Sequence, residues 1–553
     1  MFKTCHLSKQ KMGTSKILAS AATSASYNMM FQLMFRLMTF VLNAYILRHV
    51  SKEFLGVVNV RLILLYTTIL MIVREAFRRA CLSKTQDRKW QQVINLLWCI
   101  LPISVFVASF FAYIWYYILE KPDPDLVPNY GIAVICFAVS TVIENLAEPL
   151  WVISQAFLFV RLRAIVDGIC LALRVLLTAV AVTYFPHWGL FGACCAHIIS
   201  TVVYPVIYYG YFIYYLSTHQ KEIETDKFPL RSWKDFLPKQ TNGQPLFNAG
   251  LVKLTWSFFK QTVLKQLLTE GERYAMTIFN ILSFSDQGMY DVVNNLGSLV
   301  ARFVFFPIED SGFLFFTQSF TRGVPIKDQN KESVTLACRV LESLLTLVVL
   351  IGVTFLAFGY PYSYLLLDIY GGENLSSGSG PTLLRWYCVY VLIIAVNGVT
   401  ECFVFAAMSQ KEVDKYNHKM LLFSIIFLLS SYYLGKHLGG VGFILANCLN
   451  IAARVAHSVY YIHHFTKDSD HYPLRGMFPS MPVMICYIGS FLITFYSERF
   501  FCCDSGWVTR LVHIGVGGVC LLVVLGAIFL TQKRLLTFVV EQYKEKIMHT
   551  KAE

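Results

Sequence analysis

The 27 residues Val93–Leu119, VINLLWCILPISVFVASFFAYIWYYIL, contain no Asp, Glu, Lys or Arg. A helix needs about 20 mostly apolar residues to cross the ~30 Å hydrocarbon core of a bilayer, so this stretch is long enough to span one. Leu511–Gln532 is also uncharged, and Trp188–Thr218 carries no ionisable group of this kind apart from His197. These stretches predict membrane-spanning helices.

The composition of the whole chain agrees with a membrane protein. Apolar residues make up 56% of its 553 residues and charged residues only 15%, against about 25% in a typical soluble domain. This excludes a secreted disulfide scaffold, a disordered regulator and an ordinary cytosolic enzyme. The net charge of +13 indicates basic cytosolic loops and no nucleic-acid partner. The 15 Cys show no CxxC pair or Cys/His ligand spacing, so we expect no metal site, no cofactor and no disulfide framework.

Fourteen stretches have the length of a membrane span. An even number places both termini on one side, and the basic N-terminal arm, the basic connection after the second span and the basic tail place that side in the cytosol. The sequon Asn374-Leu-Ser376 lies in a connection without Lys or Arg, which we expect to face the lumen and to accept glycosylation. We predict an all-α polytopic protein with spans at 18–48, 54–80, 91–119, 130–159, 163–185, 188–216, 252–281, 287–318, 333–358, 380–408, 416–435, 440–465, 478–497 and 508–531.

Weak internal matches keep their order between the first six spans and the next six. Asn145-x2-Glu148 is similar to Asn397-x3-Glu401, and further pairs have offsets that change only once along the chain. Because six is even, the halves share their orientation, and transporters built in this way bind substrate between the halves. We predict two six-helix parallel-repeat lobes around a central cavity, at 1–216 and 251–466. A tolerant cytosolic linker at 217–250 joins them, and 467–553 adds two extra helices and a cytosolic tail.

Polar residues recur three and four positions apart in several predicted spans, which places them on one helical face. An ionised side chain facing lipid costs at least ~2.5–3.5 kcal/mol, so we expect these faces to line a shared aqueous cavity. The alternative is that they join helices through Arg–Glu and Asn–Asn contacts. The predicted cavity residues are Arg36, Arg74, Lys265, Arg302, Arg454, Asn43, Asn295 and His457, with Glu75, Glu272, Asp291 and Glu309 as charge partners.

Other charged residues have a simpler interpretation. Arg48 and Arg78 lie near span ends, where long side chains reach the membrane surface. Glu144 and Glu148 fit either a function or a structural pair with Arg163 or Arg174, and His197 fits a satisfied core histidine.

The cavity composition favours an anionic ligand. Arginine presents a planar fork that suits phosphate oxygens, so a phosphate or pyrophosphate head group fits. The chain contains no GxxxxGK[ST], GxSxG or HExxH motif, so nothing in it indicates an ATP site or an enzyme.

Six stretches of these helices are similar to the Rft family of the endoplasmic reticulum, and the likeness runs nearly end to end. They are RLMTFVLNA (36–44), GVVNVR (56–61), REAFRRA (74–80), LTEGERY (268–274), DVVNNLGSLVAR (291–302) and GVTECF (398–403). The family belongs to the multidrug/oligosaccharidyl-lipid/polysaccharide exporter superfamily. The resemblance implies two six-helix lobes and two extra helices. It also implies a role in supplying a dolichyl-pyrophosphate oligosaccharide of five mannoses and two N-acetylglucosamines to the lumenal leaflet for N-glycosylation.

Three functions follow as hypotheses. The first is a flippase or scramblase for this glycolipid, with dolichyl-pyrophosphate oligosaccharide and membrane lipids as its partners. The second is an accessory protein that binds the same glycolipid without transporting it. The third is an ion-coupled small-molecule antiporter of the same fold, whose titrating carboxylates would be Glu148 and Glu401.

Overall fold

The computed structural model describes residues 34–35, 38–83, 89–157, 159–218, 230–240, 245–322, 324, 326–467, 469, 471–503 and 506–532. Within these ranges the chain forms helices and no strand, which confirms the predicted all-α class. Ten of the described helices are long and apolar enough to cross a membrane, or eleven if the bent pair α6 and α7 is one span. Helices are expected here because a lipid-embedded backbone must satisfy its own hydrogen bonds.

Three of the fourteen predicted spans are not among these helices. Most of 18–48 lies outside the described residues, although Met38–Leu47 forms a short apolar helix there. The other two, 252–281 and 287–318, are helical in the structure but carry the polar faces that lower their hydropathy. The count of fourteen therefore stays a prediction.

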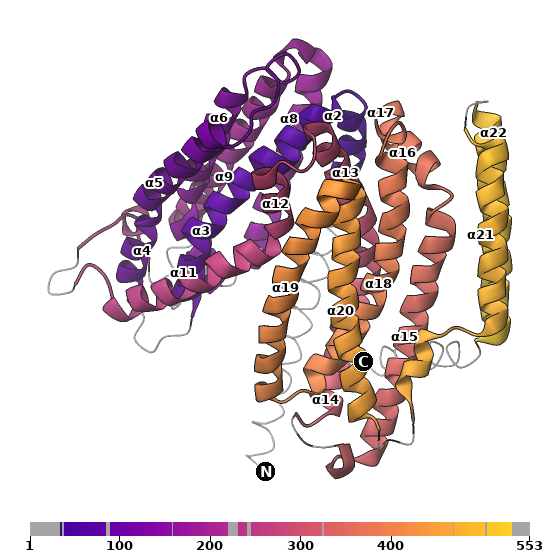
Figure 1. Cartoon of the computed structure of the whole chain (residues 1–553). Coiled ribbons are helices and arrows are strands. Elements are labelled where there is room, and N and C mark those ends of the chain that lie inside the picture. Colours follow the sequence, from indigo (N-terminus) through magenta and orange to yellow (C-terminus); the bar gives the residue numbers. More distant parts are fainter. Residues whose placement is uncertain are drawn as a thin grey trace. The chain divides into compact units, whose positions relative to one another are not determined.

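Chain contacts divide the protein into two units, Met1–Ile278 and Phe279–Glu553. The division falls later than the predicted lobe boundary at 251, because α11 packs along α3 within the first unit. In that unit α3 also packs against α5 and α6, and α9 packs against α6 and α8 (Figure 1). Its elements are α2 Lys52–Leu55, η1 Gly56–Leu62, α3 Ile63–Leu82, α4 Trp90–Trp98, α5 Ile100–Tyr113, η2 Ile114–Ile118, α6 Tyr130–Asn145, α7 Glu148–Ala156, α8 Val160–Tyr184, η3 Pro186–Trp188, α9 Leu190–Thr218, η4 Trp233–Phe236, α11 Ala249–Thr269 and α12 Gly271–Phe279.

The second unit is organised around α18, which packs against α13, α14, α15 and α20. Helix α19 packs against α20, and α21 pairs with α22 (Figure 1). The elements are α13 Phe284–Val300, η5 Ala301–Phe305, α14 Phe306–Ser319, η6 Ile326–Asp328, α15 Lys331–Gly359, α16 Ser363–Gly371, α17 Glu373–Ser376, α18 Gly380–Ala407, α19 Gln410–Leu438, α20 Gly440–Phe465, η7 Pro473–Met477, α21 Met481–Phe501 and α22 Trp507–Thr531.

Breaks in the long helices have local causes. Helices α6 and α7 meet at an angle of 46°, and Pro149 occupies the first turn of α7. Proline has no backbone N–H and cannot continue the hydrogen bonds of a preceding helix, so the bend follows from the sequence. The π-helical turns η1 and η5 interrupt the α-helical pattern, as insertions of this kind do at functional positions. Arg302 lies in η5, so its helix changes geometry at a predicted cavity residue.

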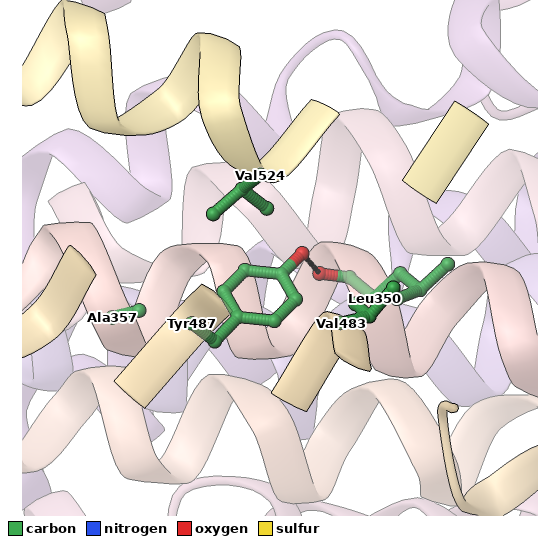
Figure 2. Close-up of a cluster of buried hydrophobic side chains, with 5 residues drawn as sticks. All are labelled: Leu350, Ala357, Val483, Tyr487 and Val524. Atoms are coloured by element: carbon green, nitrogen blue, oxygen red, sulfur yellow. Dashed lines mark hydrogen bonds between the residues drawn. The ribbon is translucent and has the colours of Figure 1, made fainter. Parts of the chain in front are cut away.

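The C-terminal helices pack onto α15 through a small apolar cluster of Leu350, Ala357, Val483, Tyr487 and Val524 (Figure 2). The Tyr487 hydroxyl donates to the Leu350 carbonyl oxygen at 3.0 Å and lies 2.7 Å from the Thr354 hydroxyl. This satisfies the one polar group that the cluster buries. Most other apolar side chains of α21 and α22 are exposed, as expected where helices face lipid.

The side chains of the neighbouring residues Cys502 and Cys503 are in contact. A link between adjacent residues connects no distant elements, so packing, hydrogen bonds and ion pairs hold the helices together. No group of His, Cys, Asp or Glu that could hold a metal ion occurs in the described part of the chain.

Candidate functional site

A cluster of charged and phenolic side chains is buried in the first unit. Arg74 Nη1 lies 2.6 Å from Glu144 Oε1 and 3.4 Å from Glu148 Oε1. Arg78 binds the Glu148 carboxylate with two nitrogens, Nε at 2.8 Å and Nη2 at 2.5 Å. The Tyr66 hydroxyl donates to Glu144. Two arginines of α3 thus neutralise two carboxylates at the bend between α6 and α7.

Burial explains why this cluster is paired. The Glu148 side chain is 0% exposed and the Arg78 side chain 13%. A buried ion without a partner costs several kcal/mol of desolvation, which hydrogen-bonded pairing offsets. The Trp151 ring lies 3.6 Å from the Arg78 guanidinium carbon and shields it from solvent. These contacts hold α3 to α6 and α7.

The second unit holds a similar cluster at Glu401 of α18. Arg454 of α20 binds its carboxylate with two nitrogens, at 2.8 and 2.7 Å. The Tyr416 hydroxyl of α19 donates to it at 2.6 Å, and the Asn397 amide at 3.1 Å. Four donors from three helices converge on this one carboxylate, which fixes α18, α19 and α20 to one another.

Two more basic side chains extend this cluster. The His457 ring stacks on Tyr416 at a centroid distance of 4.6 Å, and Lys419 Nζ lies 3.2 Å from His457 Nε2. Lysine is only a donor, so Nε2 accepts and Nδ1 carries the ring hydrogen. The Nδ1 atom is buried and has no hydrogen-bond partner among the described residues. The second cluster therefore has more basic groups than carboxylates.

The two clusters occupy positions that the internal matches align. Glu148 and Glu401 are the paired glutamates of those matches, and each receives a two-nitrogen arginine contact. Their arginines come from different places, the second predicted span in one unit and the twelfth in the other. The two clusters share an arginine–glutamate contact, but the arginines lie in spans that do not correspond.

The structure places the predicted cavity cations in different environments. Arg36 lies outside the described residues. Arg74 and Arg454 are bound to carboxylates of their own units. Lys265 on α11 and Arg302 in η5 are exposed. Among the described residues, no carboxylate forms an ion pair with Arg302.

The remaining predicted residues are scattered over both units. Asn43 is exposed, and Asn295 donates to the buried Asp291 at 3.0 Å. Glu75 pairs with Arg79 at 3.0 Å, and Glu272 is half-buried on α12. The half-buried Glu309 packs so closely on Gly398 that a Cβ there would overlap its carboxylate.

The structure also places Arg48, Arg78, Asn374 and His197. Arg48 is exposed near the end of its helix, while Arg78 belongs to the buried cluster. Asn374 is exposed on α17. His197 is buried, stacks on Phe137 at 4.1 Å and lies 2.9 Å from the Ser140 hydroxyl, which confirms the core histidine.

The suggested partners of Glu144 and Glu148 are wrong. Arg163 pairs with Asp167 at 3.5 Å, and Arg174 donates to the Ser200 hydroxyl at 3.2 Å. The structural pairing of the two glutamates is therefore observed, but with α3. Helix α3 packs directly against both α6 and α7, which brings its arginines to these carboxylates.

Sequence reasoning missed the hydroxyl and aromatic members of the clusters. Tyr66 and Tyr416 each donate to a buried glutamate, and Trp151 covers an arginine. Tyrosine and tryptophan are so common in this chain that nothing distinguishes these three by sequence. Lys419 does follow Tyr416 at a spacing of three, which could have placed it on the polar face of α19.

Comparison with known proteins adds a family. The family model described as Rft protein matches residues 20–542. The protein named Man(5)GlcNAc(2)-PP-dolichol translocation protein RFT1 from Xenopus tropicalis is 50% identical over 529 residues, which cover 96% of this chain and 98% of that protein.

Two solved structures share the fold at low sequence identity. One is described as lipid II flippase MurJ in an inward closed conformation, with a TM-score of 0.54 and 12% identity, over 91% of this chain and 98% of that one. The other is an inward-facing multidrug resistance MATE family transporter of the MOP superfamily. Its TM-score is 0.50 at 13% identity, over 80% of this chain and 99% of that one. At such identities the likeness concerns the fold alone.

Proposed function

We propose that this chain, which belongs to the Rft protein family, moves dolichyl-pyrophosphate-linked oligosaccharide between membrane leaflets. The oligosaccharide is the intermediate of five mannoses and two N-acetylglucosamines, and the direction is from the cytosolic to the lumenal leaflet of the endoplasmic reticulum. The observation that carries this proposal is the 50% identity, over 96% of the chain, to a protein named for this translocation. The MOP-type fold supports it, because substrates of such transporters cross between helices within the membrane.

The pyrophosphate is the part of the substrate that the protein must stabilise away from water. Exposed cations meet this need better than cations that already bind a carboxylate, because displacing a buried carboxylate breaks charge-assisted hydrogen bonds. In the described structure Arg302 and Lys265 are exposed, and Lys419 with His457 adds basic groups beside Arg454. We therefore assign anion binding first to Arg302, with Lys419 and His457 of the same unit as auxiliary groups, while the role of Lys265 in the first unit stays a prediction.

The buried clusters have a different role in this proposal. Arg74 with its glutamates, and Arg454 with Glu401, fasten helices within their own units. A transporter that changes shape needs rigid bodies between its moving parts, and multiply bonded buried ions provide rigidity. The predicted cavity roles of Arg74 and Arg454 thus become roles in holding its walls. Asn43, Asn295 and the carboxylates Glu75, Glu272, Asp291 and Glu309 stay predictions.

The remaining parts of the proposal concern setting and topology. We infer a transporter and not an enzyme, located in the endoplasmic reticulum membrane with both termini cytosolic and Asn374 in the lumen. The proposed domain division keeps two parallel lobes joined by residues 217–250, followed by the two additional helices. With no ATP-binding motif in the sequence, transport is passive or driven by consumption of the glycolipid in the lumen.

The two alternatives differ in what they require of these residues. An accessory protein that binds the glycolipid needs the exposed cations but no exchange of leaflets. An ion-coupled antiporter needs carboxylates that can release their partner, yet Glu148 and Glu401 each receive a two-nitrogen arginine contact. No observation in the structure favours the antiporter.

Reconstitution tests the proposal directly. Purified protein in vesicles should raise the rate at which labelled dolichyl-pyrophosphate oligosaccharide becomes accessible from the opposite leaflet, relative to protein-free vesicles. Arg302→Ala and Arg302→Glu should abolish this gain, with Arg302→Lys intermediate because lysine keeps the charge but loses the fork. Binding of the glycolipid without any change in its sidedness would contradict the transport proposal and support the accessory protein.

A further inference from the structure

Four side chains of α4 bind the backbone of a segment that lies between α9 and α11. We name residues 230–240 together with 245 and 246 the clasp segment. The sequence predicts that the whole region 217–250 tolerates shortening; that stays a prediction, and these bonds argue against it for the clasp segment. Gln91 donates to the Leu237 carbonyl at 3.0 Å, Gln92 to the Pro245 carbonyl at 3.0 Å and Trp98 to the Phe236 carbonyl at 2.7 Å. Asn95 donates to the carbonyls of Lys239 at 3.0 Å and Leu246 at 3.1 Å, and its side-chain oxygen accepts from the Lys239 N–H at 2.9 Å.

The four side chains of α4 lie at the N-terminal end of a membrane span. Helix α4 opens the span Trp90–Ile118, whose 29 residues extend about 43 Å at 1.5 Å per residue. That length matches the ~40–45 Å thickness of a bilayer including its head groups. Gln91 and Trp98 are separated by about 10 Å along this helix, which corresponds to the head-group layer and its boundary with the hydrocarbon. The clasp segment therefore lies beside the span at that depth.

The chemistry of the bonds fits such a position. Within the hydrocarbon region, non-helical backbone is tolerated only where its polar groups find partners in the protein, and Trp98 reaches the boundary of that region. Five carbonyl oxygens of the clasp segment find theirs on α4, and Gln92 and Asn95 are themselves 6% and 4% exposed. A loop that extended into the cytosol would have water for these carbonyls and no need of buried amides.

The two sides of the clasp segment differ. Leu230 and Phe236 are buried, and the Phe236 ring lies 5.5 Å from Phe212 of α9. Trp233, Leu237 and Leu246 point outward, with Trp233 54% exposed. Exposed basic residues stand among them at Arg231, Lys234 and Lys239. The Asp235 carboxylate accepts hydrogen bonds from the backbone N–H groups of residues 231 and 232. The rest of the outward face is basic and apolar.

We propose that the clasp segment is a membrane-surface anchor. Trp233, Leu237 and Leu246 enter the head-group layer on the side predicted to be cytosolic, and the neighbouring basic residues contact lipid phosphates. Tryptophan and lysine together at this depth are the usual composition of membrane-interface anchors, and anionic lipids of a cytosolic leaflet attract such basic residues. The bonds to α4 fix the anchor to the first unit.

Quenching of tryptophan fluorescence tests this placement in the full-length protein in lipid nanodiscs. The chain has nine Trp, so the contribution of Trp233 is the difference between the wild type and Trp233→Phe. We expect that difference to be quenched by phosphatidylcholine brominated near the head group and protected from aqueous iodide. Quenching by iodide with no effect of the brominated lipid would overturn the proposal. The phenylalanine variant keeps an aromatic ring at an exposed position and should fold normally.

A second variant tests the lipid phosphates. Adding phosphatidylserine to the nanodiscs should increase the brominated-lipid quenching of Trp233, and the triple change of Arg231, Lys234 and Lys239 to Gln should remove that increase. The matched control changes Lys331, Lys411 and Lys415, three exposed lysines of the second unit, to Gln and should retain it. An increase that survives in the clasp variant would overturn the role of the basic residues.

Discussion

The Arg454–Glu401 pair allows structural and ligand-binding roles to be separated by one set of variants. Arg454 binds the carboxylate with two nitrogens, and the two side chains are 23% and 12% exposed. Replacing Arg454 by Met keeps an apolar side chain of similar length in the helix but leaves Glu401 without a cation. Removing one partner of a buried pair costs about 3–5 kcal/mol.

The contacts that remain around Glu401 predict that the cost of losing Arg454 lies at the lower end of that range. After Arg454→Met the carboxylate still accepts from Tyr416 at 2.6 Å and from Asn397 at 3.1 Å, and it can gain some water. We therefore expect a loss of about 3 kcal/mol in the free energy of unfolding, roughly a hundredfold in the equilibrium constant for unfolding. In the double variant with Glu401→Gln no charge is stranded. The loss should fall to about 1 kcal/mol, the value of an ordinary hydrogen bond.

The measurement is equilibrium unfolding in mixed detergent micelles for the wild type, both single variants and the double variant. Because Glu401→Gln alone is also destabilising, the cycle should give a coupling energy of at least about 2 kcal/mol, the difference between Arg454→Met and the double variant. The matched control is Arg163 with Asp167, an i,i+4 pair at 3.5 Å whose side chains are 47% and 50% exposed. An exposed pair of this kind contributes about 0.2–1 kcal/mol. Equal coupling energies for the two pairs would refute the reasoning.

Transport by the same variants completes the test. If Arg454 only holds α20 to α18, the double variant should fold and move labelled glycolipid at a rate near that of the wild type. If Arg454 also binds the pyrophosphate, the double variant should fold and fail to transport.

Three further outcomes are expected. Arg78→Ala removes the cation bound to a fully buried glutamate and should cost about 3 kcal/mol of unfolding free energy in mixed micelles. Arg79→Ala, a half-buried neighbour with an i,i+4 partner, should cost about 0.3–0.5 kcal/mol, and similar costs would contradict the buried pairing. Asn374→Gln should remove an endoglycosidase-sensitive shift on gels, and a wild-type chain without that shift would count against glycosylation there. Gly398→Ala should lower transport because its Cβ overlaps the carboxylate packed on α18, while Gly489→Ala, with nothing within 4 Å, should leave transport unchanged.

High hydropathy identifies the spans whose sides all face apolar surroundings, and it does not identify helices that carry a polar face. Lys331–Gly359 and Trp507–Thr531 are evident from composition and are helices in the structure. Helix α11 carries Lys253, Lys260 and Lys265, and its charges keep it below the hydropathy of a lipid-exposed span. Such helices are predicted here from the length of their mostly apolar stretches, which tolerates isolated charges.

The buried pairs were visible in part. Arg74 and Arg78 are four residues apart on α3, as are Glu144 and Glu148 in sequence, which would place each pair on one face of an unbroken helix. The structure instead bends between the two glutamates. Their pairing depends on α3 packing against both α6 and α7, which no local spacing encodes. The bonds of the clasp segment are harder to predict from sequence. Asn95 and Lys239 are 144 residues apart, and Lys239 takes part only through its backbone.

The pairing changes which arginines suit an anionic substrate. Sequence position alone makes Arg74, Arg302 and Arg454 equivalent candidates, since each lies on a polar helical face. In the structure Arg74 and Arg454 already bind carboxylates, so an arriving pyrophosphate would first have to displace them and leave a buried glutamate unpaired. Arg302 carries no such cost, because it is exposed and no carboxylate among the described residues forms an ion pair with it. The order of sensitivity to charge-conserving substitution should follow this difference, with Arg302→Lys affecting transport and Arg454→Lys affecting stability.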